Sequence, residues 1–147
     1  MSFGKMPIAN GFLKKNNFKK EFFFNLEVGF SKKLSLFQIN EHPKPEQMFN
    51  KNYPFFTGSS KGMINHFKEY SKWIKKHYGK GLKNLLEIGS NDGTFLNNFN
   101  KKKIKVIGFE PSSNVANISK KKGIKTINSF FDYKNVKHLK SLQKKIN

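Results

Sequence analysis

The stretch LLEIGSNDGTFL, residues 85–96, is the most informative part of the sequence for the fold. It joins an apolar run to a polar loop between two glycines, Gly89 and Gly93, and then becomes apolar again. A short apolar run bounded by glycine is typical of a buried strand, and glycine permits the positive φ that a tight turn requires. We therefore predict a strand ending near Gly89, a loop up to Gly93 and a helix over residues 93–102.

Strands and helices alternate on both sides of this stretch. Upstream, apolar residues at helical spacing begin at Met63, with Ser59 or Ser60 as a cap and Gly79 near the stop. Downstream, the predicted strands cover residues 105–110 and 125–130, and the predicted helices cover 112–123 and 135–146. Such alternation indicates βαβ units in a parallel sheet. The expected fold class is α/β, a partial Rossmann-like doubly wound parallel sheet with its first three strands.

The first part of the chain shows the period-two alternation of strands. Residues 21–39 are predicted to form a β-hairpin, with alternate apolar positions from Phe22 to Phe30 and a Ser-Lys-Lys turn. Prolines, which break regular structure, and an aromatic, glycine-containing segment follow the hairpin. We therefore divide the chain into a small β-rich module, 1–58, and an α/β domain, 59–147.

The predicted sheet is unfinished. Three strands and their helices make half of a doubly wound fold, and no strand follows the last predicted helix before Asn147. Either a partner completes the sheet or the chain is truncated. Because an unpaired strand edge invites association, we expect self-association or a complementing C-terminal half.

The formal charge of +20 suggests a nucleic-acid partner, but its make-up argues against specific recognition. Every basic residue is lysine, whereas base readout relies heavily on arginine. The lysines are spread along the chain among Asn, Phe and Ile, a composition that A/T-rich codons produce without selection for a ligand. Compositional drift and weak polyanion binding both stay open as explanations.

Several other classes of protein are disfavoured. The chain has no cysteine, which excludes disulfides and thiolate metal sites. No metal site is expected at its histidines, which lack metal-ligand spacing; they are His42, His66, His77 and His138. The apolar runs fall far short of the ~20 residues of a membrane span, and the first residues contain no secretory signal. We therefore expect a cytoplasmic protein.

The loop after the first predicted strand lacks the common nucleotide-binding patterns. Asn91 and Thr94 stand where G-x-G-x-x-G needs glycine, and no phosphate-loop motif is present. The pattern is instead E-x-G-x-x-x-G-x-F over residues 87–95, and Glu110 ends the next predicted strand. A carboxylate there can accept both ribose hydroxyls. We also expect Gly93 to allow close approach of a ligand, and free N–H groups at the helix start to favour an anion.

This combination resembles motif I and the acidic second-strand residue of class I S-adenosylmethionine-dependent methyltransferases. Further segments occur in the order seen in the C-methyltransferase family that acts on nucleotide-linked deoxysugars: GKMPIANGFL, LFQI, MFNKNYPFFTGSS, HFKEYSKWI, LEIGSNDGTFL, GFEPSSNVA and GIKTINSFF. The resemblance extends from Phe3 to Phe131. It implies S-adenosyl-L-methionine as cofactor and a nucleotide-linked sugar as substrate.

The resemblance also implies a set of cofactor-binding residues: Tyr53, Glu87, Gly89, Asn91, Asp92, Gly93, Glu110, Pro111, Ser112 and Phe130. The glycine loop would surround the methionine part, Glu110 would hold the ribose, and Pro111 and Ser112 would shape the adenosine edge. Phe130 is either a wall for the adenine or a core residue. The Tyr53 hydroxyl either contacts the sulfonium end or belongs to an aromatic cluster.

Two departures from the family matter. The family's N-terminal module binds zinc through paired C-x-x-C motifs, but Ser31 and Leu34 replace the second pair, and the first would lie before Met1. The module must therefore fold without metal, or it is only poorly stable. The family's sugar-binding region and general base lie downstream of this chain's last residue, so no catalytic residue is assigned. His66 is interpreted as structural and His138 as solvated.

Two functional hypotheses follow. In the first, the chain is the cofactor-binding portion of a sugar C-methyltransferase and is inactive without further residues. In the second, it is a non-catalytic remnant or a lysine-rich module that binds polyanions.

Overall fold

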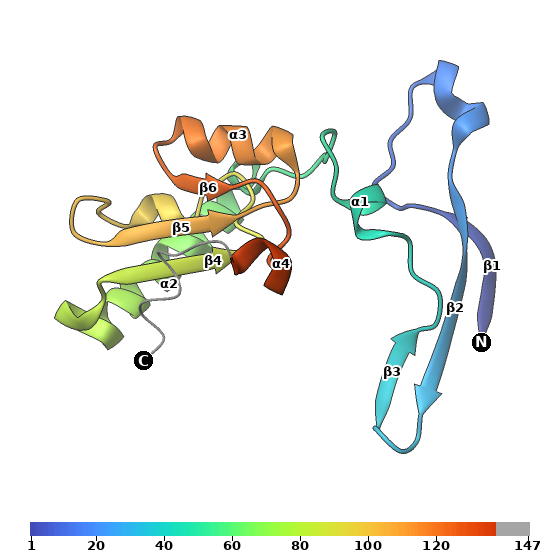
Figure 1. The fold of residues 1–147 in the computed structure, drawn as a ribbon, viewed down its shortest axis with the longest axis horizontal. Helices are drawn as coiled ribbons and strands as arrows, with labels where there is room; N and C mark the ends of the chain where they lie inside the picture. Colours follow the sequence, from blue (N-terminus) through green and yellow to red (C-terminus); the bar gives the residue numbers. More distant parts are fainter. Residues whose placement is uncertain (138–147) are drawn as a thin grey trace. The chain divides into compact units, whose positions relative to one another are not determined.

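The computed structural model describes residues 1–137, which fall into two compact units (Figure 1). The first unit is Met1–Phe49, and the second begins at Asn50. Residues 50–58, which the sequence analysis placed in the N-terminal module, therefore belong to the second unit.

The first unit is a three-stranded antiparallel sheet in the order β1-β2-β3. Its strands are β1 (Ser2–Pro7), β2 (Phe23–Ser31) and β3 (Leu36–Ile39). The hairpin predicted over residues 21–39 is confirmed as β2 and β3, which pair from Val28 with Ile39 to Ser31 with Leu36. Strand β1, which pairs with β2, was not predicted.

Little of this first unit is buried. Phe24, Leu26 and Val28 are half-buried on β2, in agreement with the predicted alternation, whereas Phe30 is 61% exposed. The remaining elements are short: the 3-10 helix η1 (Lys15–Lys20) and the helix α1 (Pro45–Met48). Pro45 occupies the first turn of α1, where its fixed φ suits a helix. The prediction that prolines break regular structure is thus wrong at Pro45.

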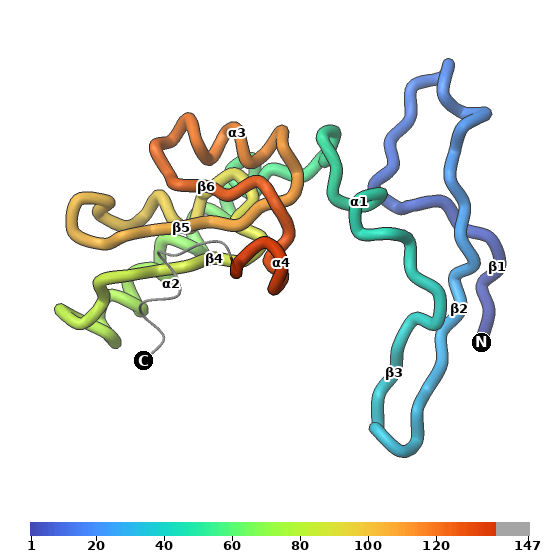
Figure 2. The backbone as a smooth tube through the Cα atoms, in the orientation of Figure 1, coloured from blue at the N-terminus to red at the C-terminus, as the bar shows by residue number. Residues whose placement is uncertain are grey.

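The second unit contains a parallel sheet in the order β4-β5-β6, as Figure 2 shows along the backbone. Its strands are β4 (Asn84–Ile88), β5 (Lys105–Phe109) and β6 (Lys125–Ile127). The helices are α2 (Lys61–Tyr78), α3 (Ser113–Lys121) and α4 (Tyr133–Val136), and the 3-10 helices are η2 (Thr57–Ser59), η3 (Gly79–Gly81) and η4 (Leu96–Asn98). The predicted parallel sheet is confirmed, and so is the helix between β5 and β6, whereas only the 3-10 helix η4 lies between β4 and β5.

The predicted ends of α2 are also confirmed. The Ser60 side chain accepts a hydrogen bond from the Met63 N–H, and Gly79 ends the helix with a φ of +51°. The main buried cluster joins α2 to the sheet and to η4. Its buried members are Ile74, Phe95, Leu96, Phe99, Val106 and Ile124.

The helix predicted over residues 93–102 is wrong. A single 3-10 turn, η4, takes its place. The Asn98 side-chain amide donates to the carbonyl oxygens of Thr94 and Phe95, 2.9 and 3.1 Å away. Thr94 in turn donates its N–H and hydroxyl to the Asp92 carboxylate. These local side-chain hydrogen bonds compete with the backbone hydrogen bonds that a continuous helix would form.

Strand β6 is shorter than predicted, because the chain turns after Ile127. The Asn128 amide donates to the carbonyl oxygens of Glu110 and Pro111, each 2.8 Å away, which fixes this turn against the end of β5. The predicted last helix begins two residues earlier than expected, at Tyr133, after an Asp132 cap. Its part from residue 138 onward, with His138, lies outside the described residues. Within residues 1–137, no helix has the length and apolar character of a membrane span.

Candidate functional site

Glu110 follows β5 and points at the loop that follows β4. Its Oε2 accepts a hydrogen bond from the Asn91 N–H at 2.9 Å, and its Oε1 accepts one from the Ser112 N–H at 2.8 Å. The residue is only 4% exposed. Because parallel strands end at the same edge of the sheet, β4 and β5 deliver the loop and the carboxylate to one place. The carboxylate that the sequence analysis assigned to ribose hydroxyls is thus already bonded to the backbone.

The backbone N–H groups of this loop are not free. Asn91 donates to Glu110, Asp92 to the Asn91 side chain, Gly93 to the Ser90 carbonyl, and Thr94 to the Asp92 carboxylate. The N–H groups of these four residues are therefore not the unpaired donors that the sequence analysis expected, and binding of an anion at this loop stays a prediction.

The two glycines of the loop have different roles. Gly89 has a φ of +69°, and a Cβ there would meet no atom of the described part of the chain within 4 Å. Gly93 has a φ of +74°, and a Cβ there would lie 2.5 Å from both Ser119 Oγ and Ile124 Cδ1. Gly93 is thus required for packing of the loop against α3, rather than for approach of a ligand as predicted. The open space lies at Gly89.

The segment before α2 is hydrogen-bonded to this loop. The Thr57 N–H donates to Asn91 Oδ1 at 2.9 Å, and Asn91 Nδ2 donates to the Phe55 carbonyl at 3.1 Å. The Gly58 N–H donates to Asp92 Oδ2 at 3.0 Å, and a Cβ on Gly58 would lie 2.7 Å from that oxygen. Thr57 and Gly58 could not be predicted from the sequence, because hydrogen bonds between residues 34 positions apart leave no local pattern.

Tyr53 lies in the same segment and is half-buried. Its carbonyl accepts a hydrogen bond from Asn114 Nδ2 at 2.7 Å, which ties the segment to α3. Its ring meets the Phe55 ring edge-on, with centroids 5.9 Å apart. The ring is therefore part of an aromatic pair, and a contact between the hydroxyl and a sulfonium stays a prediction.

Asp92 is buried and anchors the loop. Burial alone would raise its pKa, but hydrogen bonds from Thr94 and Gly58 and the nearby charge of Lys122 hold that pKa below its usual value. Lys122 Nζ lies 3.2 Å from Asp92 Oδ2, and the Thr94 hydroxyl lies 2.6 Å from Oδ1. Asp92 is therefore an ionised structural residue, and Lys122 is a partner that the sequence analysis missed.

Glu87 has the most perturbed carboxyl group of this site. Within the described residues its Oε2 is buried and accepts no hydrogen bond. Burial, with the negative charges of Asp92 and Glu110, raises the pKa of Glu87 to about 8. Near neutral pH the group therefore holds a proton, unless a cation comes close enough to favour its ionised form.

The remaining predicted residues surround the turn after β5. Ser112 is fully buried, its hydroxyl oxygen has no hydrogen-bond partner among residues 1–137, and its carbonyl accepts the Ala116 N–H at the start of α3. Pro111 is half-buried, and its carbonyl accepts the Asn128 amide. Phe130 is half-buried, and its carbonyl accepts from Asn135 Nδ2 at 3.1 Å. Whether Phe130 forms a wall for adenine stays a prediction.

The structure thus joins one group of predicted residues by direct hydrogen bonds. Asn91, Asp92, Glu110 and Ser112 share bonds with one another, and the Tyr53 segment joins them through Phe55 and α3. A ligand that suits this group carries a positive charge near Glu87 and hydroxyl donors near Glu110.

The N-terminal unit matches a known protein family. Residues 1–49 match the Methyltransf_13 family, which is described as "Putative zinc binding domain". The residues present do not fit zinc. The chain has no cysteine, and among residues 1–137 no three His, Asp or Glu side chains gather in a way that could hold a metal. At the positions where Ser31 and Leu34 replace the family's second cysteine pair, the Ser31 hydroxyl accepts the Leu34 N–H at 3.4 Å.

The second comparison covers most of the chain. The C-methyltransferase NovU of Streptomyces niveus is 26% identical over 133 residues, which make up 89% of this chain and 31% of that protein. The chain thus spans about a third of the length of this relative. The match of the N-terminal unit and the similarity to NovU together support a C-methyltransferase-type family for this chain.

Proposed function

We propose that the second unit binds S-adenosyl-L-methionine as the methyl donor of a methyltransferase that acts on carbon of a nucleotide-linked deoxysugar. The observation that carries the proposal is the bond between Glu110, after β5, and Asn91, in the loop after β4. The parallel order β4-β5-β6 is that of one half of a Rossmann-like doubly wound sheet, whose ligands bind beyond the strand ends. The relative's name supports methylation of carbon.

Glu110 is proposed to receive the ribose hydroxyls. Each carboxylate oxygen has a second acceptor position, so the bonds from Asn91 and Ser112 keep the group in place while it accepts further donors. Because Glu110 is 4% exposed, its surroundings must open for the ribose to reach it. Pro111 and Ser112 then border the adenosine, with Phe130 as the proposed wall for the adenine.

Glu87 is proposed to receive the ammonium group of the methionine part. Its Oε2 is buried without a donor, and the open side of Gly89 leaves space next to this strand end. A positive charge near Glu87 favours its ionised form, so binding near neutral pH is accompanied by release of the proton that Glu87 holds. When bound, the cofactor supplies an electrophilic methyl group.

The acceptor half of the reaction is assigned to no described residue. Transfer of a methyl group requires alignment of the two partners, and methylation of carbon beside a carbonyl also requires a base. In this proposal the chain contributes cofactor binding, and a complementing part contributes the base and the sugar site. The proposed location is cytoplasmic.

Isothermal titration calorimetry of the full chain with S-adenosylhomocysteine tests the proposal. We expect weak, measurable binding and at least roughly tenfold loss in Glu110→Gln, because a hydrogen bond to a charged group contributes ~1.5–3 kcal/mol. Glu69→Gln removes an exposed carboxylate on α2 and is the matched control. Circular dichroism verifies that each variant is folded.

The same titration distinguishes the proposed function from the alternative one. A folded parent that gives no heat with S-adenosylhomocysteine, or equal affinity in Glu110→Gln, contradicts the proposal. Tight DNA binding at physiological salt, with a steep salt dependence, would instead favour the lysine-rich polyanion-binding module.

A further inference from the structure

The side chain of Asn114 is hydrogen-bonded through its nitrogen but not through its oxygen. Asn114 is the second residue of α3, which begins directly after the turn from Glu110 to Ser112. Its Nδ2 donates to the Tyr53 carbonyl at 2.7 Å. Its Oδ1 is buried and has no hydrogen-bond partner among residues 1–137. Because a buried acceptor without a donor is unfavourable, this oxygen suits a donor that a ligand brings.

The hydrogen bond to Tyr53 determines which way the Asn114 amide points. If the amide were turned over, Oδ1 would face the Tyr53 carbonyl, and two acceptors would meet at a hydrogen-bond distance. The amide therefore directs its oxygen, and not its nitrogen, away from Tyr53. The group that pairs with this oxygen must be a hydrogen-bond donor.

Buried side-chain oxygens without a partner gather at one edge of the parallel sheet. Within residues 1–137 they all lie near or beyond the carboxyl ends of β4, β5 and β6. They are Glu87 Oε2, Ser90 Oγ, Ser112 Oγ, Asn114 Oδ1 and Ser129 Oγ. The three serine hydroxyls can donate as well as accept, and Glu87 holds a proton near neutral pH. Asn114 Oδ1 is the member of this group that can only accept.

The proposed cofactor has one set of donors that no residue has yet been given. S-adenosylmethionine carries hydrogen-bond donors on its ammonium group, on its ribose hydroxyls and on the exocyclic amine of its adenine. Glu87 is proposed to receive the ammonium group and Glu110 the ribose hydroxyls. Pro111 and Ser112, which are proposed to border the adenosine, lead directly into the first turn of α3. The adenine amine is therefore the donor that suits Asn114 Oδ1.

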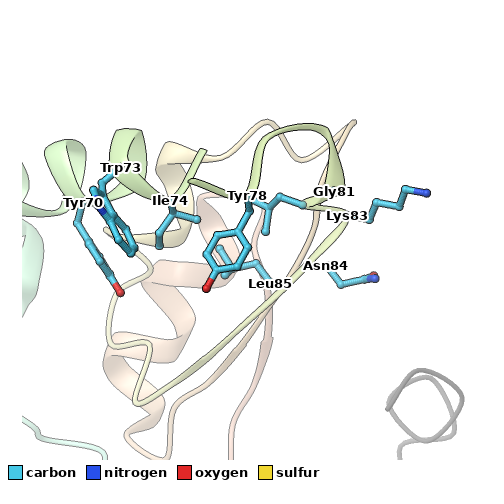
Figure 3. A pocket seen from close by; sticks show the side chains of 9 residues that line it. Tyr70, Trp73, Ile74, Tyr78, Gly81, Lys83, Asn84 and Leu85 are labelled. Carbon is cyan, nitrogen blue, oxygen red and sulfur yellow. The ribbon is translucent and has the colours of Figure 1, made fainter. Parts of the chain in front are cut away.

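The groove between α2 and β4 does not compete for the adenine (Figure 3). Its volume is about 550 Å³, and α2 contributes Tyr70, Trp73 and Tyr78 to its lining. The remaining lining, residues 81–85, lies before β4 or in its first two residues. Glu110 instead follows the carboxyl end of β5, which runs parallel to β4. Because adenine is bonded directly to ribose, a ribose at Glu110 holds the adenine away from this groove.

On the basis of the proposed binding of S-adenosylmethionine, we propose that Asn114 Oδ1 accepts a hydrogen bond from the exocyclic amine of adenine. Asn114 is then a residue that determines specificity for the base. Hypoxanthine has a carbonyl oxygen in place of this amine and would bring a second acceptor against Oδ1. A site that is built to bond a donor rejects an analogue that lacks it, because the polar group of the site stays unpaired. Like Glu110, Asn114 Oδ1 becomes accessible when its surroundings open.

Calorimetry of the full chain with two ligands tests this role. S-inosylhomocysteine differs from S-adenosylhomocysteine in having hypoxanthine in place of adenine. We expect the parent to bind S-adenosylhomocysteine at least about tenfold more tightly. In Asn114→Ala the acceptor is absent, so the two affinities are expected to lie within about threefold of each other. Asn117→Ala, which changes an exposed asparagine of the same helix, is the matched control and keeps the ratio of the parent.

The ratio of the two affinities separates recognition of the amine from a structural role. Loss of the bond to Tyr53 alone would weaken both ligands alike and leave the ratio unchanged. Asn114→Asp retains acceptor oxygens but cannot donate to Tyr53, and it is expected to keep the preference for adenine whether or not Asn114→Ala folds. Equal affinities in the parent, or an unchanged ratio in a folded Asn114→Ala, overturn this inference and leave the proposed function in place. A folded parent that binds neither ligand overturns both.

Discussion

Glu87 gives the second unit a dependence of stability on pH. Its pKa is about 8 in the folded chain against 4.5 for a free group, so folding favours the protonated form. The contribution of Glu87 is therefore fully present below pH 4.5 and is lost as the pH rises to about 8, by at most about 5 kcal/mol. In Glu87→Gln this loss is absent.

Urea unfolding followed by Trp73 fluorescence between pH 4.5 and 8 measures this effect. The difference in free energy of unfolding between the parent and Glu87→Gln is expected to grow with pH, in favour of the variant. Because both proteins carry the same histidines, their titration cancels in the difference. A difference that stays constant across this range would show that Glu87 titrates normally.

Gly93 is a second residue with a specific structural demand. In Gly93→Ala the new Cβ would overlap Ser119 and Ile124, at a φ that alanine rarely adopts, so we expect a loss of at least about 2 kcal/mol in stability. Gly81→Ala is the matched control, because a Cβ there meets open space at an ordinary φ. We expect that control to stay within about 0.5 kcal/mol of the parent. Similar losses in both variants would contradict the packing role of Gly93.

Among the elements, those with a long and regular pattern could be predicted from the sequence. Strands β4 and β5 and helix α2 follow directly from apolar runs and helical spacing. Strand β1 could not, since Ser2–Pro7 has no clear alternation and contains Gly4 at a φ of +76°. The helix after Gly93 was predicted wrongly because the bonds of Asp92 and Asn98 to the nearby backbone depend on their side-chain conformations.

The candidate site, too, could be predicted from the sequence only in part. The positions of Glu110 and of the loop followed from strand order, because successive parallel strands end side by side. The hydrogen-bond and ion-pair partners of these residues could not be predicted from the sequence. Thr57, Gly58 and Lys122 reach the loop from distant parts of the chain, and only the folded structure brings them together.

The segment between residues 53 and 58 supplies a prediction for an element. Asn91→Ala removes its bonds to the Thr57 N–H and the Phe55 carbonyl. The Thr57 amide is therefore expected to exchange with deuterium at least about fivefold faster, since a lost hydrogen bond is worth about 1 kcal/mol. Asn97→Ala changes an exposed asparagine of η4 and is the control. Equal Thr57 exchange in the two variants would show that Asn91 does not hold this segment.

At the scale of the whole chain, the N-terminal unit matches a family that is described as a zinc-binding domain, but it contains no cysteine to bind zinc. Its sheet is held by hydrogen bonds, including one from Asn40 Nδ2 to Glu27 Oε1 at 2.9 Å and one from the Met1 ammonium to the Val28 carbonyl at 2.8 Å. We therefore expect neither EDTA nor added zinc to change circular dichroism or melting temperature. Stoichiometric zinc in the purified protein, with loss of structure on chelation, would contradict this account.

Glu110 and the loop around Asn91 are proposed to receive a nucleoside with an amino-acid tail. The most direct measurement is titration of the ¹⁵N-labelled chain with S-adenosylhomocysteine, followed by NMR at each backbone amide. We expect saturable shifts at the Asn91 and Ser112 amides, which donate to Glu110. Saturable shifts that leave both amides unmoved, or no shifts at millimolar ligand, would contradict it.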